Sequence, residues 1–235
     1  MFDPSHIALG VLWFLVFLLS TTVHEAAHAW TAMRGGDRTA YHFGQVTLSP
    51  FPHMQREPFG MLVFPWLTFL MSGWMMGWAS APYDPYWAMR HPHRAAGMSL
   101  AGPLANFVLA GIAAILIRAG IAAELFQPGM SIGFTNIVLA NSAAPAVAEA
   151  FATLLSIMFS LNILLGTFNL IPLPPLDGFT AIGLILPERM AAKLNEWKMT
   201  MGGYQMIGML VAWQVAGMVI RPVYYVGLQL LFFGL

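Results

Sequence analysis

The chain has 235 residues, of which 58% are hydrophobic and 9% are charged, and its mean hydropathy is +0.69. Soluble domains carry about 25% charged residues, so this composition cannot cover a globular surface with polar groups and predicts a polytopic membrane protein. A formal net charge of zero argues against a nucleic-acid partner, and the absence of cysteine excludes disulfides, thiolate metal sites and a cysteine nucleophile.

The first apolar run predicts a membrane-spanning helix at about 6–33, because a span needs about 20 mostly apolar residues. Residues 1–6 contain no Lys or Arg, unlike the start of a signal peptide. The run continues into His24-Glu25-Ala26-Ala27-His28 instead of a cleavage site. We therefore expect this first span to be retained in the mature protein.

The next part of the chain predicts two further spans and a small β element. In the polar loop at 34–58, Tyr41–Leu48 has enough aromatic and β-branched residues for a short strand or hairpin. The second and third spans are expected at 59–79 and 96–117. The stretch 118–148 contains several Gly and Pro residues and is expected at the membrane interface.

The last third of the chain predicts one regular span and one interrupted span. The fourth span, at 149–170, is followed by three closely spaced prolines, which forbid a regular helix there. A short apolar piece at 179–186 and a charged stretch at 187–200 come next. The final apolar region, 204–235, contains Arg221-Pro222 and is expected to form one span plus a re-entrant or surface helix.

Together these elements predict an all-α polytopic membrane protein with a single domain over 1–235. We expect about five to six transmembrane or re-entrant helices, with a small β-hairpin or sheet after the first span. Lys and Arg fall on both sides of the second predicted span, so the positive-inside rule leaves the orientation open. The lipid bilayer is an expected partner.

Two of these apolar segments contain charged or titratable residues. His24 and His28 are four residues apart and would lie on one helix face with Glu25 beside them, which suits a metal site in which Glu acts as general base. A catalytic zinc ion uses three protein ligands, and Asp177 is the only acid in a proline-broken apolar segment. Asn169, eight residues earlier, could hydrogen-bond the substrate backbone or the oxyanion. Simple local roles remain open: Asp177-Gly178 as a turn, and Asn169 as a cap.

Three motifs in this order resemble the site-2 protease family of intramembrane zinc metalloproteases, peptidase family M50, in its short form without PDZ or CBS domains. The first motif is His24–His28, which matches the family's H-E-x-x-H. The second is Ala101–Asn106, which matches A-G-P-x-x-N, and the third is Asn169–Gly178, which matches N-x-x-P-x-P-x-x-D-G.

The resemblance implies an intramembrane zinc endopeptidase that cuts in or near transmembrane segments of membrane-protein substrates. It also implies a location in a prokaryotic cell (inner) membrane. It implies one zinc ion per chain held by His24, His28 and Asp177, with Glu25 as the base. Substrate-contacting positions would be Asn169, Pro172 and Pro174, whereas Asn106 would be structural. A helical substrate must unwind before it is cut, and the strand expected at 41–48 could pair with it.

Two other classes of protein remain as alternatives. A membrane scaffold could keep the fold without cleaving, although the retained Glu25 argues against it. A small transporter with a metal site at a broken helix is less favoured, because the chain shows no internal inverted repeat.

Overall fold

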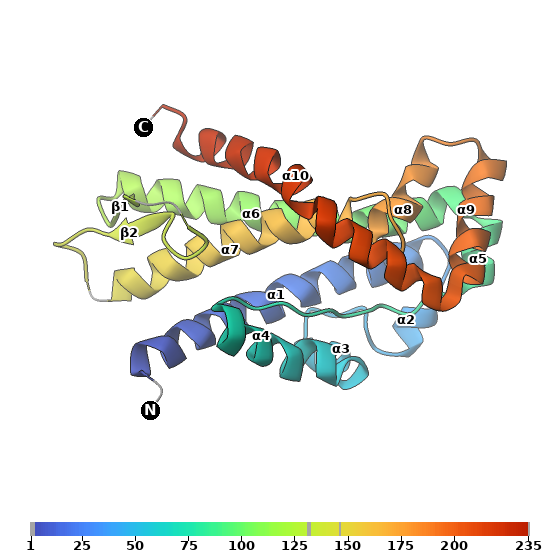
Figure 1. Ribbon diagram of the computed structural model, residues 1–235, viewed down its shortest axis with the longest axis horizontal. Helices are drawn as coiled ribbons and strands as arrows, with labels where there is room; N and C mark the ends of the chain where they lie inside the picture. Colours follow the sequence, from blue (N-terminus) through green and yellow to red (C-terminus); the bar gives the residue numbers. More distant parts are fainter. Residues whose placement is uncertain (1–2, 131–132, 146, 235) are drawn as a thin grey trace.

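The computed structural model describes residues 3–130, 133–145 and 147–234 and shows a largely helical molecule built along one long axis (Figure 1). Within these described ranges, four helical stretches are long and apolar enough to cross a membrane. They are α1 (Pro4–Arg34), α6 (Pro92–Ala122), α7 (Val147–Asn169) and the stretch Glu188–Phe232. The last contains α9 (Glu188–Met201) and α10 (Gln205–Phe232), joined by a 3₁₀ turn. The all-α polytopic membrane class is therefore confirmed, and the chain is an integral membrane protein.

Helices α1, α6 and α7 lie side by side along this axis, and α10 crosses α7 (Figure 1). Small residues such as Ala110 and Ala113 let α6 approach its neighbours closely, as in other membrane bundles. Larger side chains fill two clusters. The first, between α6, α7, α10 and the segment 126–138, includes Ile117, Phe126, Phe159 and Leu231. The second, between α1, α4 (Phe64–Ser72) and α7, includes Trp13, Phe17, Phe69 and Ile157.

The second predicted span, 59–79, is wrong in its length. A π-helical turn at Phe59–Val63 leads into α4 (Phe64–Ser72), which ends at Gly73 in the left-handed conformation, with φ 78°. Only glycine adopts this φ without strain, and it stops the helix. The chain then returns without regular structure, and Trp78 N donates to Gly60 O at 3.2 Å. Segment 59–84 therefore folds back on itself, and its helical part, Phe59–Ser72, is shorter than the four helical stretches that could cross a membrane.

The strand predicted at Tyr41–Leu48 is also wrong. Asp37 accepts hydrogen bonds from the backbone N and the hydroxyl of Thr39, at 2.9 and 2.6 Å, and α2 (Thr39–His42) begins there. Helix α3 (Pro50–Arg56) follows, with Pro50 at its first position, where proline favours a helix start. The hydrogen bonds of Asp37 and the proline at the start of α3 thus outweigh the strand preference of the aromatic and β-branched side chains.

The small sheet of the structure lies elsewhere, in the segment expected at the membrane interface. Strands β1 (Phe126–Pro128) and β2 (Val138–Ala140) pair antiparallel, with Gln127 opposite Leu139. A sheet was thus correctly expected, but it follows the third long apolar segment of the sequence and not the first.

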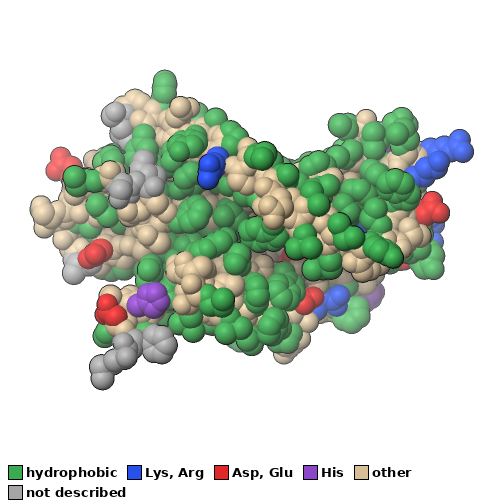
Figure 2. Space-filling model, in the orientation of Figure 1, with side chains coloured by type: hydrophobic (Ala, Val, Ile, Leu, Met, Phe, Trp, Pro, Cys, Tyr) green, Lys and Arg blue, Asp and Glu red, His purple; other side chains and the backbone are tan. Residues whose placement is uncertain are grey.

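The C-terminal part differs from the prediction at one point. Helix α10 continues through Arg221-Pro222, so the predicted interruption is wrong. Proline removes one backbone hydrogen bond, a defect that helices in membranes tolerate. Figure 2 shows hydrophobic side chains over the middle of the visible face, as expected for a surface in contact with lipid.

Before α9, the proline-rich loop after α7 leads into the short helix α8 (Asp177–Ala181), which is followed by a 3₁₀ turn. Lys198 Nζ donates to Thr180 Oγ1 at 3.3 Å and ties α9 to α8. This contact and the loop fix the position of Asp177, the first residue of α8.

Candidate metal centre

Helix α1 carries His24, Glu25 and His28 in its last third, each with 7% of its surface exposed. The two histidines are one helical turn apart, so their rings lie on one face. Their ring centroids are 4.6 Å apart, and the two Nε2 atoms are separated by 2.9 Å. Local helix geometry alone therefore brings together two nitrogen atoms that could bind one metal ion.

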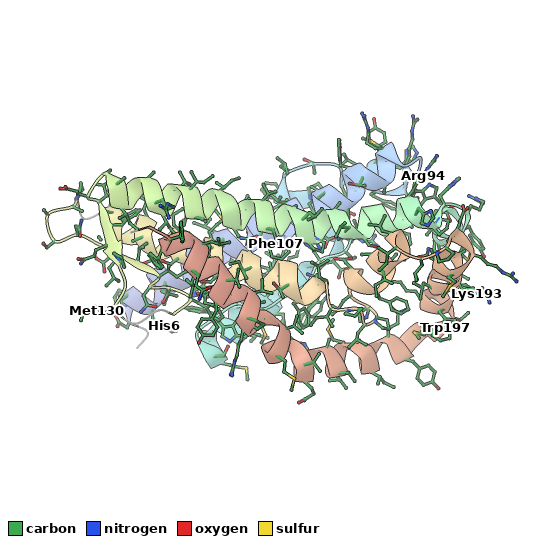
Figure 3. All side chains as sticks on the ribbon, turned by 90° about the horizontal axis from the view of Figure 1, so that it is seen from above. His6, Arg94, Phe107, Met130, Lys193 and Trp197 are labelled. Atoms are coloured by element: carbon green, nitrogen blue, oxygen red, sulfur yellow. The ribbon has the colours of Figure 1, made fainter. Side chains whose placement is uncertain are left out.

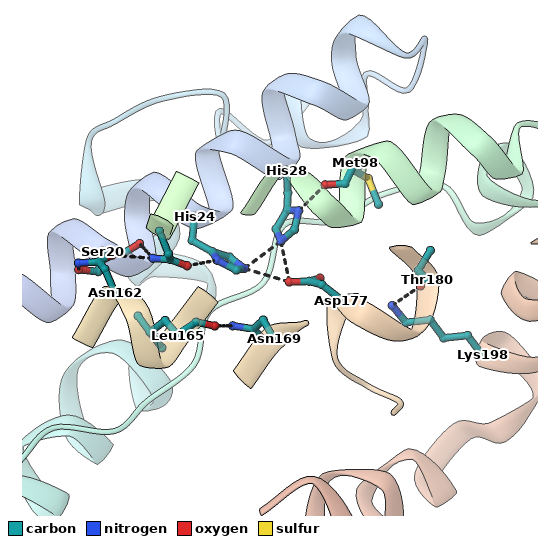
Figure 4. A network of polar contacts seen from close by, with 11 residues as sticks. Ser20, His24, His28, Met98, Asn162, Leu165, Asn169, Asp177, Thr180 and Lys198 are labelled. Carbon is teal, nitrogen blue, oxygen red and sulfur yellow. Dashed lines mark hydrogen bonds and ion pairs between the residues drawn. The ribbon is translucent and has the colours of Figure 1, made fainter. Parts of the chain in front are cut away.

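The start of α8 brings Asp177 to the same point (Figure 4). Its Oδ2 lies 3.1 Å from Nε2 of His24 and 3.2 Å from Nε2 of His28. Among the described residues, these three form the one group of His and acidic side chains that could share a metal ion. Residues 153 positions apart in sequence thus meet at one point, and their role as metal ligands stays a prediction.

Hydrogen bonds on the far side of each ring determine which imidazole nitrogen carries the proton. Nδ1 of His28 lies 2.7 Å from Met98 O, and a carbonyl oxygen can only accept, so Nδ1 donates. Nδ1 of His24 lies 2.6 Å from Oδ1 of Asn106. The amide nitrogen of Asn106 donates to Oδ1 of Asn162 at 2.8 Å, which leaves its oxygen to face His24.

In this tautomer both Nε2 atoms present lone pairs to each other and to the carboxylate of Asp177. Three electron-rich atoms at this distance in a buried site repel one another unless a cation lies between them. Two imidazole nitrogens and one carboxylate oxygen are a donor set that zinc prefers, and partners on Nδ1 are what orient such ligands. The residues present therefore fit a divalent metal ion.

Gly102 of α6 leaves the space that such an ion needs. A Cβ atom built on Gly102 would lie 2.6 Å from Nε2 of His24 and closer still to Nε2 of His28. The sequence contains the A-G-P-x-x-N match, but it gives no physical reason why glycine is needed at position 102. The backbone of α6 passes directly over the two histidines, so any side chain here would enter the site.

A buried amide chain behind His24 was not predicted either. Asn106 and Asn162 are both fully buried, and Asn162 Nδ2 donates to Ser20 Oγ at 2.9 Å and to Met158 O at 2.8 Å. Asn106, expected to be structural, contacts His24 directly. These hydrogen bonds between buried side chains connect α1, α6 and α7 and hold the ring of His24 in place.

We expect Asn106→Leu to weaken metal binding by about 10- to 100-fold, because such supporting contacts contribute that much to the affinity of a metal site. The same change at Asn195, a buried asparagine that donates to Ala88 O and lies in α9, serves as control. It removes a buried hydrogen bond without touching a ligand. Zinc dissociation constants measured by competition with a chelating dye would separate the two variants, and equal affinities would contradict the role given to Asn106.

The three remaining predicted site residues lie near this cluster but outside the group of donor atoms. Asn169 Nδ2 donates to Leu165 O at 3.0 Å and is half-buried, close to Asp177 in Figure 4. Pro172 is exposed and Pro174 is half-buried, with its carbonyl against Gly208 of α10. Asn169 thus makes a local hydrogen bond within α7, which is the kind of role that the sequence left open. Its contact with substrate stays a prediction.

The fold and the site together define a membrane protein with a buried cluster of two histidines and a carboxylate that could hold a metal ion, with a glutamate beside them. The model of peptidase family M50 matches residues 12–213, and the chain belongs to this family. It is a metalloendopeptidase of the site-2 type.

Two relatives support this assignment. The chain is 34% identical over 188 residues to "Putative zinc metalloprotease YwhC" of Bacillus subtilis (strain 168), covering 77% of this chain and 72% of that protein. It is 27% identical over 196 residues to "Putative zinc metalloprotease Rip2" of Mycolicibacterium smegmatis (strain ATCC 700084 / mc(2)155), covering 82% of this chain and 65% of that protein. No solved structure matches the chain.

Proposed function

We propose that the chain is a zinc-dependent endopeptidase that hydrolyses peptide bonds in or next to transmembrane segments of other membrane proteins. His24, His28 and Asp177 would hold one zinc ion per chain, and Glu25 would be the general base. The observation that carries this proposal is the convergence of three lone-pair donors, at 2.9–3.2 Å, inside an apolar helical bundle. The location proposed is the cell (inner) membrane of a prokaryote.

Zinc bound at these ligands would supply an acidified water and polarise the scissile carbonyl. The carboxylate of Glu25 would take a proton from that water and pass it to the leaving amine. Glu25 is buried, and its side chain has no hydrogen-bond partner among the residues that the structure describes. Its oxygens are therefore not committed to a structural contact and can accept this proton.

The substrate must present an extended segment, because the carbonyls of a helix already accept hydrogen bonds. Asn169 would hydrogen-bond this segment with the part of its amide that Leu165 does not use, and Pro172 and Pro174 would contact it. Pairing with a strand at 41–48 is not retained, since the structure has no strand there.

Metal removal tests this function on a mixture of candidate substrates. The protein would be co-reconstituted in liposomes with the membrane-protein fraction of its expression host, and new N-termini would be identified by chemical labelling. We expect new termini within or beside apolar segments, their loss after treatment with a zinc chelator, and their return with added zinc. Termini that persist after verified removal of the metal would contradict the proposal.

A further inference from the structure

A polar pocket with a volume of about 200 Å³ lies apart from the candidate metal centre, between α9 and the segment that leads into α5 (Pro85–Arg90). The polar residues in its lining are Tyr83, Asn195, Lys198 and Gln205, and none of the proposed metal ligands lines it. The first precedes α5, the next two lie in α9, and the last begins α10. The fold thus brings polar side chains from three segments around one pocket.

Hydrogen bonds fix the walls of this pocket. Asn195 is buried, and its Nδ2 donates to Ala88 O at 3.1 Å, which holds α9 against α5. Gln205 Nε2 donates to Lys198 O at 2.8 Å, which holds the start of α10 against the end of α9. The pocket is therefore formed by packed helices and not by loose surface side chains.

The ammonium group of Lys198 has no negative partner at this pocket. Its Nζ donates to Thr180 Oγ1 at 3.3 Å (Figure 4) and lies 5.9 Å from the centre of the Tyr83 ring. Among the residues that the structure describes, no carboxylate oxygen lies within ion-pair distance of this nitrogen. An ammonium group has three N–H donors, so two donors and the positive charge remain available.

The other lysine of the chain lies in a different environment. Lys193 and Lys198 are the two lysines of the sequence. Lys193 is exposed, so water solvates its charge, whereas Lys198 is half-buried beside the pocket. A charge that loses part of its water is costly unless an opposite charge or hydrogen-bond acceptors replace that water. The half-buried ammonium group therefore favours an anion in the pocket.

Two further side chains of the pocket can donate hydrogen bonds. Gln205 Nε2 uses one of its two N–H groups, and the hydroxyl of Tyr83 makes no hydrogen bond to the described residues. No described Asp or Glu lines the pocket. This set of donors suits an anion with several acceptor oxygens. Phosphate groups provide such oxygens on one centre, and lysine is a common partner for them.

The pocket lies at the level where phospholipid headgroups are expected. Figure 3 shows Lys193 and Trp197 of α9 at one end of the molecule, whereas His6 and Met130 lie at the other. Trp197 and Tyr204, each next in sequence to a lining residue, are 61% and 76% exposed. Trp and Tyr side chains are enriched where lipid meets water. Phosphate groups of membrane lipids are therefore available to the pocket.

We propose that this pocket binds a phosphate group, with Nζ of Lys198 as the cation and with Gln205 Nε2 and the Tyr83 hydroxyl as further donors. Phospholipid headgroups and inorganic phosphate both carry this group. Lys198 also holds Thr180, which follows Asp177 by three residues in α8. The bound phosphate would therefore lie beside the helix that carries a proposed metal ligand.

The two lysines allow a test on the natural chain with an internal control. The purified protein in mild detergent would be methylated with formaldehyde and cyanoborohydride, and the rate at each lysine would be measured by mass spectrometry of its peptides. The reaction would be run with dihexanoylphosphatidylglycerol, with inorganic phosphate, or with dihexanoylglycerol, which has the same acyl chains and no phosphate. Only an uncharged and uncovered amine reacts, so a bound phosphate protects Lys198.

We expect phosphatidylglycerol or inorganic phosphate, at saturation, to lower the rate at Lys198 by at least about ten-fold, because the phosphate covers the amine and favours its charged form. The rate at the exposed Lys193 should change by less than about two-fold. Protection by the lipid alone identifies a headgroup as the ligand, and protection by inorganic phosphate at equal concentration identifies free phosphate. No protection of Lys198, equal protection of both lysines, or equal protection by dihexanoylglycerol would overturn the proposal.

Lys198→Gln and Lys193→Gln form a matched pair for a second measurement. Native mass spectrometry would count the bound molecules of the phosphate compound that protected Lys198. We expect Lys198→Gln to lower the affinity by at least about ten-fold, through the loss of a hydrogen bond from a charged group, and Lys193→Gln to bind as the natural chain does. Equal binding by the two variants would also overturn the proposal.

The labelling of the natural chain needs no substitution, so it remains decisive if Lys198→Gln does not fold. Neither measurement depends on proteolysis. Failure of the phosphate site and failure of the proposed function are therefore distinguishable.

Discussion

Glu25→Gln is expected to lower peptide-bond cleavage by about 10²- to 10⁴-fold, the contribution of a positioned general base. Glutamine has nearly the same shape as glutamate but cannot accept the proton. The three proposed ligands are untouched, so the variant should retain as much zinc as the natural chain. Initial rates of appearance of new N-termini in proteoliposomes, with metal content measured on the same samples, would show this separation.

The matched control for this prediction is Glu149→Gln. Glu149 is exposed in the first turn of α7 and has no place in the proposed site. This variant should cleave at the natural rate. If Glu25→Gln cleaved as fast as Glu149→Gln while both held zinc, Glu25 would not be the base.

Gly102→Ala should abolish both metal binding and cleavage by adding one methyl group. The new Cβ would lie within 2.6 Å of Nε2 of both histidines, far inside any non-bonded contact. The neighbours cannot give way easily, because Nδ1 of His28 is held by Met98 O and Nδ1 of His24 by Asn106. We expect a loss of zinc affinity of at least about 100-fold, measured by chelator competition.

Gly97→Ala is the control on the same helix. A Cβ at Gly97 meets no other atom within 4 Å, and alanine stabilises a helix by about 1 kcal/mol relative to glycine. This variant should bind zinc normally and unfold at the same temperature or higher. Normal zinc binding by Gly102→Ala would contradict the placement of the metal beneath α6.

The parts of the molecule that depend on local pattern could be predicted from the sequence. The first, third and fourth spans were placed within about five residues of α1, α6 and α7, because long apolar runs bounded by polar loops leave little choice. The proximity of His24 and His28 follows from helix periodicity. Asp177 was singled out because an acid in a proline-broken apolar segment requires a partner.

The remaining features depend on contacts between distant segments. The reversal at Gly73 is fixed by the approach of Trp78 to Gly60, which hydropathy does not register. Asn106 and Asn162 lie in two apolar helices, and only their packing shows that they support His24.

The most direct test of the metal centre is the metal content of the purified protein in mild detergent, for the natural chain and for Asp177→Ala. Glu188→Ala, which changes an exposed acid in the first turn of α9, is the control. We predict about one zinc ion per chain in the natural protein and in Glu188→Ala, and less than about a tenth of that in Asp177→Ala. A folded natural chain that binds no divalent metal, or an Asp177→Ala variant that retains a full zinc ion, would contradict the metal centre on which the proposed function depends.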